Sequence, residues 1–73
     1  MGSLRMLSGQ EVRQILQQNG FVMVRQRGSH MIMQKRASNT TITVPVPDHR
    51  ELRIGTLASI IRQAKLAREL FEV

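Results

Sequence analysis

The strongest constraint on the fold is a long run of β-forming residues that a short glycine-containing segment interrupts. The segments "FVMVRQ" (21–26) and "HMIMQK" (30–35) are separated by Arg27, Gly28 and Ser29. A short loop with a glycine between two such segments predicts a β-hairpin. Neither segment alternates cleanly between apolar and polar residues, so the sequence does not show which side chains share a face.

A third segment, "NTTITVPV" (39–46), follows a few turn-forming residues later. It does alternate: Ile42 and Val44 point one way, and the threonines between them point the other way. We expect Pro45 and Pro47 to end this strand, because proline has no N–H to donate to a neighbouring strand. The pattern predicts a three-stranded antiparallel meander.

The segment before the hairpin, "LSGQEVRQILQQNG" (7–20), has the pattern of a capped helix. Ser8 and Glu11 have the spacing of a capping box, in which each side chain bonds the other's backbone N–H. Gly20 suits the left-handed conformation that often ends a helix. We therefore predict a helix over about 9–19.

The last segment, "GTLASIIRQAKLARELFEV" (55–73), predicts a second helix that Thr56 caps. Lys65 is expected to mark a break, with Leu70 and Phe71 in a short final turn. The predicted order is αβββα, which is an α+β fold. Two helices with apolar stripes can cover one face of the sheet and leave the other face open.

With 73 residues, the chain is long enough for a single domain, 1–73. A domain of this size is marginally stable alone, so a partner that covers part of it is plausible. The chain has no cysteine and therefore no thiolate metal site. The longest apolar run is too short to span a membrane, and no secretory signal is present, so we expect a cytoplasmic protein without a membrane partner.

The formal net charge is +6, and no residue between Glu11 and Asp48 is acidic. Nine of the eleven basic residues are arginine, whose planar donor fork suits phosphate. This bias favours a nucleic-acid partner over the alternative of a solvated basic surface. Because Phe21 and Phe71 are the only aromatic residues, a platform that stacks several bases is not expected.

Few combinations of residues in this sequence can carry chemistry. His30 and His49 do not have the spacing of metal ligands, and the five carboxylates form no ligand pattern, so we expect no metal and no cofactor. The remaining combination that could carry out catalysis is a histidine surrounded by arginines. RNA carries its own nucleophile, the 2′-hydroxyl, and histidine can transfer protons near neutral pH while basic side chains stabilise charge on the phosphate.

His30 fits this scheme because it directly follows the glycine turn. Gly28 would let the backbone approach a phosphate, and Ser29 can donate to a phosphate oxygen. The basic residues around the histidine are the candidate RNA-binding residues: Arg25, Arg27, Lys35 and Arg36. The residues by themselves favour a plainer interpretation, in which Gly28 and Ser29 only form a turn and His30 only begins a strand.

Three segments together resemble the HicA toxin family of bacterial toxin–antitoxin pairs. They are "SGQEVRQILQQNGFVMVRQRGSHMIMQKR", "TVPV" and "IGTLASIIRQA". The resemblance extends from about Leu7 to Phe71. It is specific because a Gly-Phe helix end, an Arg-x-x-Gly-Ser-His turn, a Val-Pro step and a Gly-Thr-Leu helix start occur in one chain.

The resemblance implies a small αβββα fold similar to double-stranded RNA-binding domains. It also implies the toxin of a type II toxin–antitoxin pair, a metal-independent endoribonuclease that cleaves mRNA. The histidine of the turn, here His30, would be the catalytic residue, with Gly28 and Ser29 supporting it. A HicB-type antitoxin would bind the toxin and cover that histidine. His49 would be a structural or secondary residue.

The chain departs from the family pattern at two places. Many relatives have a histidine or an aromatic residue after the catalytic histidine, where this chain has Met31–Met33. The family also commonly has a glycine where Lys65 stands, so by this resemblance the second helix is expected to run on past Lys65.

Two other classes of protein stay open from the sequence. One is a non-catalytic RNA-binding module of the same topology, although such modules usually have a lysine cluster at the start of the second helix, where this chain has "GTLASII". The other is a small interaction protein whose basic face holds an acidic partner.

Overall fold

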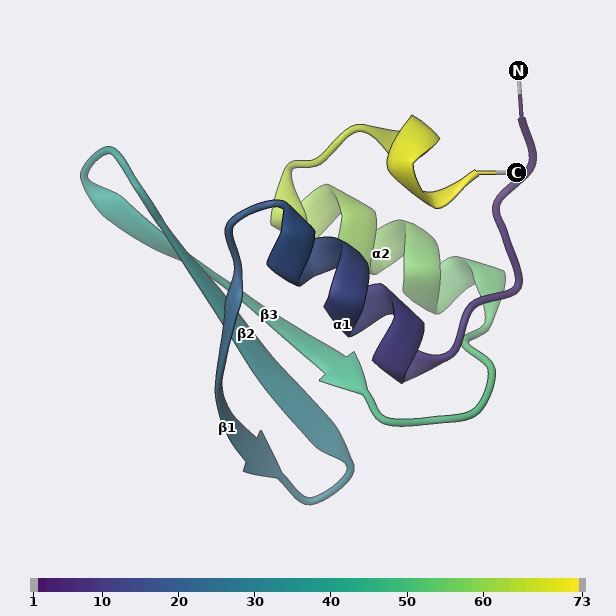
Figure 1. Cartoon of the computed structure of the whole chain (residues 1–73), viewed down its shortest axis with the longest axis horizontal. Coiled ribbons are helices and arrows are strands. Elements are labelled where there is room, and N and C mark those ends of the chain that lie inside the picture. The colour runs from purple at the N-terminus through teal and green to yellow at the C-terminus, as the bar shows by residue number, and fades with distance from the viewer. Residues whose placement is uncertain (1, 73) are drawn as a thin grey trace.

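The computed structural model describes residues 2–72, in which the chain forms two α-helices, a three-stranded antiparallel sheet and a short 3-10 helix (Figure 1). In chain order the elements are α1 (Gly9–Gln18), β1 (Val22–Arg27), β2 (His30–Ala37), β3 (Thr40–Pro47), α2 (Ile54–Ala64) and η1 (Arg68–Phe71). The strand order β1-β2-β3 is the predicted meander, so the α+β class and the αβββα order are confirmed. Met1 and Val73, which the predicted domain 1–73 includes, lie outside the described residues.

Helix α1 begins and ends as its sequence predicts. The Ser8 Oγ accepts a hydrogen bond from the Glu11 N–H at 3.0 Å, and the Glu11 carboxylate accepts one from the Ser8 N–H at 2.9 Å. The helix runs to Gln18, and Gly20 has a φ of 94°. This left-handed conformation lets the chain turn from α1 into β1 without a Cβ clash.

The β1–β2 hairpin has a tighter turn than the sequence predicted, because Arg27 already pairs with His30 and only two residues connect the strands. Gly28 has a φ of 57°, which is costly for residues with a Cβ. The register shifts between Met23 and Arg25, so Val24 forms a β-bulge. A bulge inserts one extra residue and reverses the in–out alternation beyond it. This explains why the strand lacks a clean alternating pattern.

Strand β3 corrects the prediction that Pro45 and Pro47 end it, because the strand runs through Pro45 to Pro47. Ile32 of β2 pairs with Pro45, and His30 pairs with Pro47. β3 is an edge strand, and on such a strand proline is tolerated where the missing N–H would point away from the neighbouring strand.

Helix α2 begins earlier than predicted, at Ile54, with Arg53 as its N-cap residue and no side-chain capping bond. Thr56 lies inside the first turn and is not the cap, which corrects the prediction. The break at Lys65 is confirmed: this residue has a φ of 57°, and its N–H donates to the carbonyls of Arg62 and Ile61. The expectation that the helix runs on past Lys65 is wrong, because Lys65 itself adopts the left-handed conformation typical of glycine.

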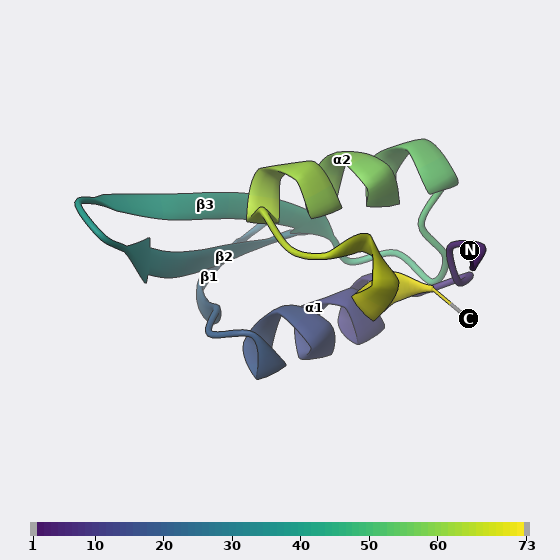
Figure 2. The same cartoon turned by 90° about the horizontal axis from the view of Figure 1, so that it is seen from above.

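The core lies between the two helices and one face of the sheet. Met31, Met33, Val44 and Val46 are at most 1% exposed and belong to one apolar cluster with side chains of both helices. The helix residues of this cluster are Val12, Leu16, Leu57, Ile60, Ile61 and Ala64. In both views the β2–β3 hairpin extends beyond the helices, so its tip is not covered by them (Figures 1 and 2). Among the described residues, no helix is long and apolar enough to cross a membrane.

Candidate functional site

His30 is an exposed residue on the face of the sheet opposite the apolar core. Its neighbour along β2, Met31, points into the core, and successive residues of a strand point to opposite faces. His30 pairs with Arg27 of β1 on one side and with Pro47 of β3 on the other. Because residues directly opposite one another on neighbouring strands share a face, Arg27 and Pro47 lie on either side of the His30 imidazole.

The next row of this open face places a second arginine near the histidine. Ile32 lies two residues after His30 and pairs with Arg25 on one side and with Pro45 on the other. The bulge at Val24 lies just before Arg25, so Arg25 and Arg27 share the open face while Met23 pairs with core residue Met33. The structure therefore brings both arginines onto the face of His30.

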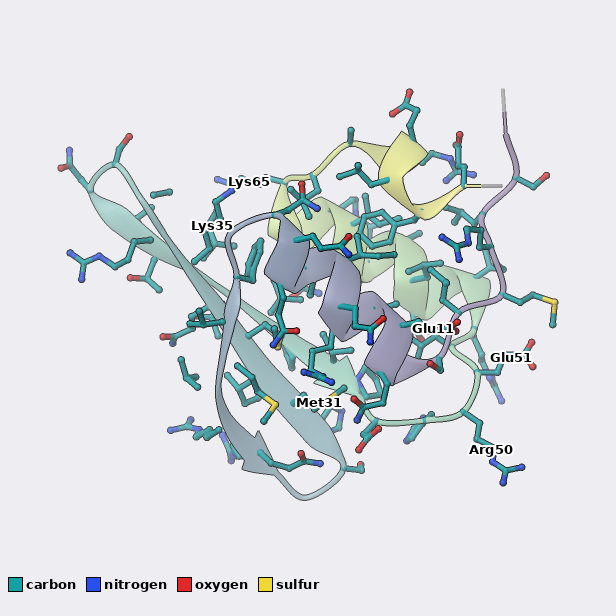
Figure 3. All side chains as sticks on the ribbon, in the orientation of Figure 1. Glu11, Met31, Lys35, Arg50, Glu51 and Lys65 are labelled. Carbon is teal, nitrogen blue, oxygen red and sulfur yellow. The ribbon has the colours of Figure 1, made fainter. Side chains whose placement is uncertain are left out.

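The other two basic candidates of β2 lie on opposite faces. Arg36 is on the open face, because it is an even number of residues from His30. Lys35 is on the helix side, where its Nζ lies 5.7 Å from the centroid of the Phe21 ring. Figure 3 shows Lys35 near the loop that joins α1 to β1, where its side chain passes Gly20. Lys35 is thus not brought together with His30.

The turn that carries His30 is held by hydrogen bonds to its backbone carbonyls. The Asp48 N–H donates to the Ser29 carbonyl at 2.6 Å, and the side-chain Nε2 of Gln26 donates to the Gly28 carbonyl at 3.2 Å. No atom lies within 4 Å of the position that a Cβ on Gly28 would occupy. Glycine is therefore favoured here by its backbone conformation, and the space next to it is open to a ligand.

The segment that holds this turn is itself held by α1. The Gly9 N–H donates to the His49 carbonyl at 2.9 Å, and the Gln10 amide donates to the Asp48 carboxylate at 3.0 Å. A Cβ on Gly9 would collide with the Pro47 carbonyl oxygen. Close packing at Gly9 therefore fixes the end of β3, which in turn positions the His30 turn.

Two hollows meet at His30. The first, which we call the arginine hollow, has a volume of about 640 Å³ and is lined by Arg27, Gly28, His30, Ile32 and Pro45. The second, which we call the helix hollow, has a volume of about 460 Å³. Its lining residues are His30, Pro45 and Pro47 of the sheet and Gly55, Thr56, Ser59, Ile60 and Gln63 of α2. His30 and Pro45 border both hollows.

Sequence reasoning missed the polar residues of α2. Thr56, Ser59 and Gln63 have the i, i+3, i+7 spacing that places side chains on one face of a helix. This polar stripe lies beside the apolar stripe that packs on the core, and it forms part of the helix hollow. The spacing was visible in the sequence, but the stripe's position next to His30 was not.

The open face is electropositive. Among residues 2–72, the ion pair that forms is Arg68–Glu72, which lies near the C-terminus and not on the sheet. The side chains of Arg25, Arg27 and Arg36 therefore form no ion pair there and can bind an anionic ligand. The strands contain no carboxylate, because no residue from 12 to 47 is acidic. In the described part of the chain, no three His, Asp or Glu side chains are grouped to hold a metal ion.

Comparison with protein families gives a match over most of this structure. A family model described as "HicA toxin of bacterial toxin-antitoxin" matches residues 9–66 of the 73. The chain belongs to the HicA toxin family. The matched residues run from the start of α1 to just past the end of α2, so they include both hollows of this HicA-family toxin. A search of curated proteins gives no significant match.

Family membership gives the coarse role of the chain and one of its partners. A HicA-family protein is the toxin of a bacterial toxin–antitoxin pair, so its role is toxic and its partner is an antitoxin. The resemblance that the sequence predicted is therefore confirmed.

Proposed function

We propose that this HicA-family toxin is a metal-independent endoribonuclease that cleaves mRNA with His30 as its catalytic residue. The observation that carries the proposal is the position of His30: it is exposed on a carboxylate-free face, directly beside Arg27 and one row from Arg25. An imidazole, which can both accept and donate a proton, suits proton transfer at a phosphodiester when it lies next to fixed positive charges.

The reaction uses the nucleophile that RNA provides. The 2′-oxygen forms a bond to the adjacent phosphorus, and the bond from phosphorus to the 5′-oxygen breaks. The 2′-hydroxyl gives up a proton and the leaving 5′-oxygen gains one, so the products are a 2′,3′-cyclic phosphate and a 5′-hydroxyl. His30 carries out one of these proton transfers, and water carries out the other. The arginines stabilise the charge that builds on the phosphate oxygens.

The RNA backbone lies along the open face of the sheet in this proposal. Arg25, Arg27 and Arg36 share that face with His30, and arginine binds phosphate through two parallel N–H groups. Gly28 leaves open space beside the turn, and within residues 2–72 the Ser29 side chain makes no hydrogen bond, so its hydroxyl is available to a phosphate oxygen. Lys35 was predicted as a fourth RNA-binding residue. It lies on the helix side of the sheet, so the proposal assigns RNA binding to the three arginines of the open face.

We propose further that the antitoxin is of the HicB type and covers the same open face. A partner that inhibits cleavage must exclude RNA from His30, and a face with unpaired arginines attracts an acidic surface. A non-catalytic RNA-binding module would use the same arginines, so cleavage has to be measured directly.

The experiment compares the parent chain with His30→Ala, His30→Gln and His49→Ala. Each is expressed from a tightly repressed promoter, and growth and total mRNA integrity are followed after induction. The purified proteins are then incubated with RNA in excess EDTA. We expect His30 variants to lose about 10²–10⁴-fold in cleavage rate, which is the usual contribution of general acid–base catalysis. His49→Ala removes the same side chain from an exposed position outside both hollows and keeps activity.

Two controls make this test decisive. An RNA with 2′-deoxyribose at the cleaved position must resist the parent protein, and circular dichroism must show that the His30 variants are folded. A folded His30→Ala protein that still degrades mRNA would contradict the assignment. Salt-dependent RNA binding by the parent without cleavage would support the RNA-binding module in its place.

A further inference from the structure

We infer that the helix hollow is a binding subsite for one nucleobase, and that Ser59 and Gln63 of α2 set the nucleotide preference of cleavage. The inference rests on the proposed ribonuclease function and deepens it. It starts from the fact that His30 borders two hollows with different chemistry.

The two hollows match the two ends of a nucleotide. The arginine hollow contains a guanidinium and an open glycine turn, which suit a phosphate. The helix hollow is lined by no arginine or lysine. Its polar side chains are the hydroxyls of Thr56 and Ser59, the amide of Gln63 and the imidazole of His30, which suit an uncharged group with a polar edge. In a nucleotide the ribose links the phosphate to the base. With the phosphate and base in these hollows, the ribose and its 2′-hydroxyl lie beside the shared residue, His30.

The walls of the helix hollow suit a base with apolar faces and a polar edge. Pro45 and Pro47 form an apolar side on the sheet, and Ile60 of α2, a core residue that is 2% exposed, also borders the hollow. Thr56, Ser59 and Gln63 provide hydroxyl and amide groups opposite. Single-stranded RNA is read by apolar contact with a splayed base and by hydrogen bonds to its edge.

The amide of Gln63 contacts the other polar residue of the subsite. Its Nε2 donates to the Ser59 Oγ at 3.0 Å, one turn away on the exposed side of α2, and this occupies one of its two N–H groups. The second N–H and the carbonyl oxygen remain to pair with a base edge that offers one acceptor and one donor. The Ser59 hydroxyl accepts from Gln63, so its own hydrogen can be donated to a base atom or back to its helix.

The first test maps cleavage sites by sequencing 5′-hydroxyl ends after limited digestion of a mixed RNA pool. The proteins are the parent, Ser59→Ala, Gln63→Ala and Gln14→Ala. Gln14 is an exposed glutamine of α1 outside both hollows, so Gln14→Ala is the matched control for losing a helical amide. We expect the parent to prefer one nucleotide at a fixed position, and Gln63→Ala to reduce that preference about tenfold, as expected for losing a bidentate base contact.

The preference is the ratio of kcat/KM between the favoured nucleotide and its competitors at that position. In Gln63→Ala this ratio should fall while the pH profile of cleavage, which reports His30, stays that of the parent. Gln14→Ala should keep both. An unchanged preference in Ser59→Ala and Gln63→Ala, with the parent active, would overturn the subsite and leave the proposed ribonuclease function standing.

The second test does not depend on activity. Amide and side-chain NMR signals of His30→Ala are followed during titration with each of the four nucleoside 3′-monophosphates and with inorganic phosphate. The inference expects shifts at Ser59 and Gln63 with a favoured nucleotide and not with phosphate. Equal shifts with phosphate, or none at α2, would overturn it. Loss of antitoxin binding in Gln63→Ala with an unchanged cleavage pattern would also overturn it, by assigning the hollow to the antitoxin.

Discussion

The two faces of β2 differ in burial although their residues alternate along one strand. Met31 and Met33 point toward the helices and are 1% and 0% exposed, whereas His30 and Arg36 point to the open face and are exposed. Ile32, which lies between them on the open face, is the exception at 8% exposed. Apolar burial on the helix side supplies most of the stability that this small chain has, because burial is the dominant favourable term in folding. The open face is therefore free to carry charged and titrating groups at little cost in stability.

The largest expected change in the free energy of unfolding comes from substitution on the helix side of β2. Met33→Ala removes a fully buried side chain and is expected to lower the free energy of unfolding by about 2–5 kcal/mol. Gln34→Ala, the next residue and on the open face, should cost less than about 1.5 kcal/mol, because it removes a single exposed hydrogen bond to Thr43. Urea unfolding of both variants checks this. Equal losses would show that the faces share the stabilisation.

The two faces should also differ in RNA binding. In the His30→Ala background, Arg27→Ala should weaken binding and lower the slope of log Kd against log salt by about 0.7, the value for one phosphate contact with a single strand. Lys35→Ala should leave the slope unchanged, since Lys35 lies over Phe21 on the helix side. Fluorescence titrations at several salt concentrations measure both slopes. An equal fall in the slope for Lys35→Ala would show that Lys35 also contacts the RNA backbone, as the sequence predicted.

Lys65 gives a way to change stability without touching the open face. It ends α2 in the left-handed conformation, with a φ of 57°. Because that conformation costs residues with a Cβ about 1 kcal/mol, Lys65→Gly should stabilise the protein by about that amount. Lys65→Ala keeps the strain while removing the charge, and serves as the control. Thermal unfolding measures stability, and an altered RNA cleavage rate in Lys65→Gly would show that the end of α2 affects the site.

The smallest expected effect lies at the capping box of α1. The pKa of Glu11 lies below its ordinary value of 4.5, chiefly because the Ser8 N–H donates to its carboxylate. A lowered folded pKa contributes stability above the unfolded pKa, and this contribution is lost as the pH falls through the folded pKa. Glu11→Gln keeps a capping side chain but does not titrate. The difference in melting temperature between parent and variant should therefore change below about pH 4.5 and stay constant above it.

The sequence by itself determined the local features of this protein. The capping box of α1, the glycine turns at Gly20 and Gly28, and the break at Lys65 follow from interactions between residues close in the chain. The order of strands followed too, since short connections leave few ways to pair neighbouring strands. His30 was also found from its local context, as the residue after the turn.

Other features depend on contacts between distant residues, and only the tertiary structure decided them. The bulge at Val24 set which residues of β1 accompany His30, and the edge position of β3 let it continue through its two prolines. Packing of α2 beside β3 brought Ser59 and Gln63 to the same hollow as His30. Side-chain direction in a strand depends on register, and a shift of one residue reverses every face. His30 could therefore be found as a candidate from the residues next to it in the chain. The residues that surround it in space were decided by how the sheet and helices pack.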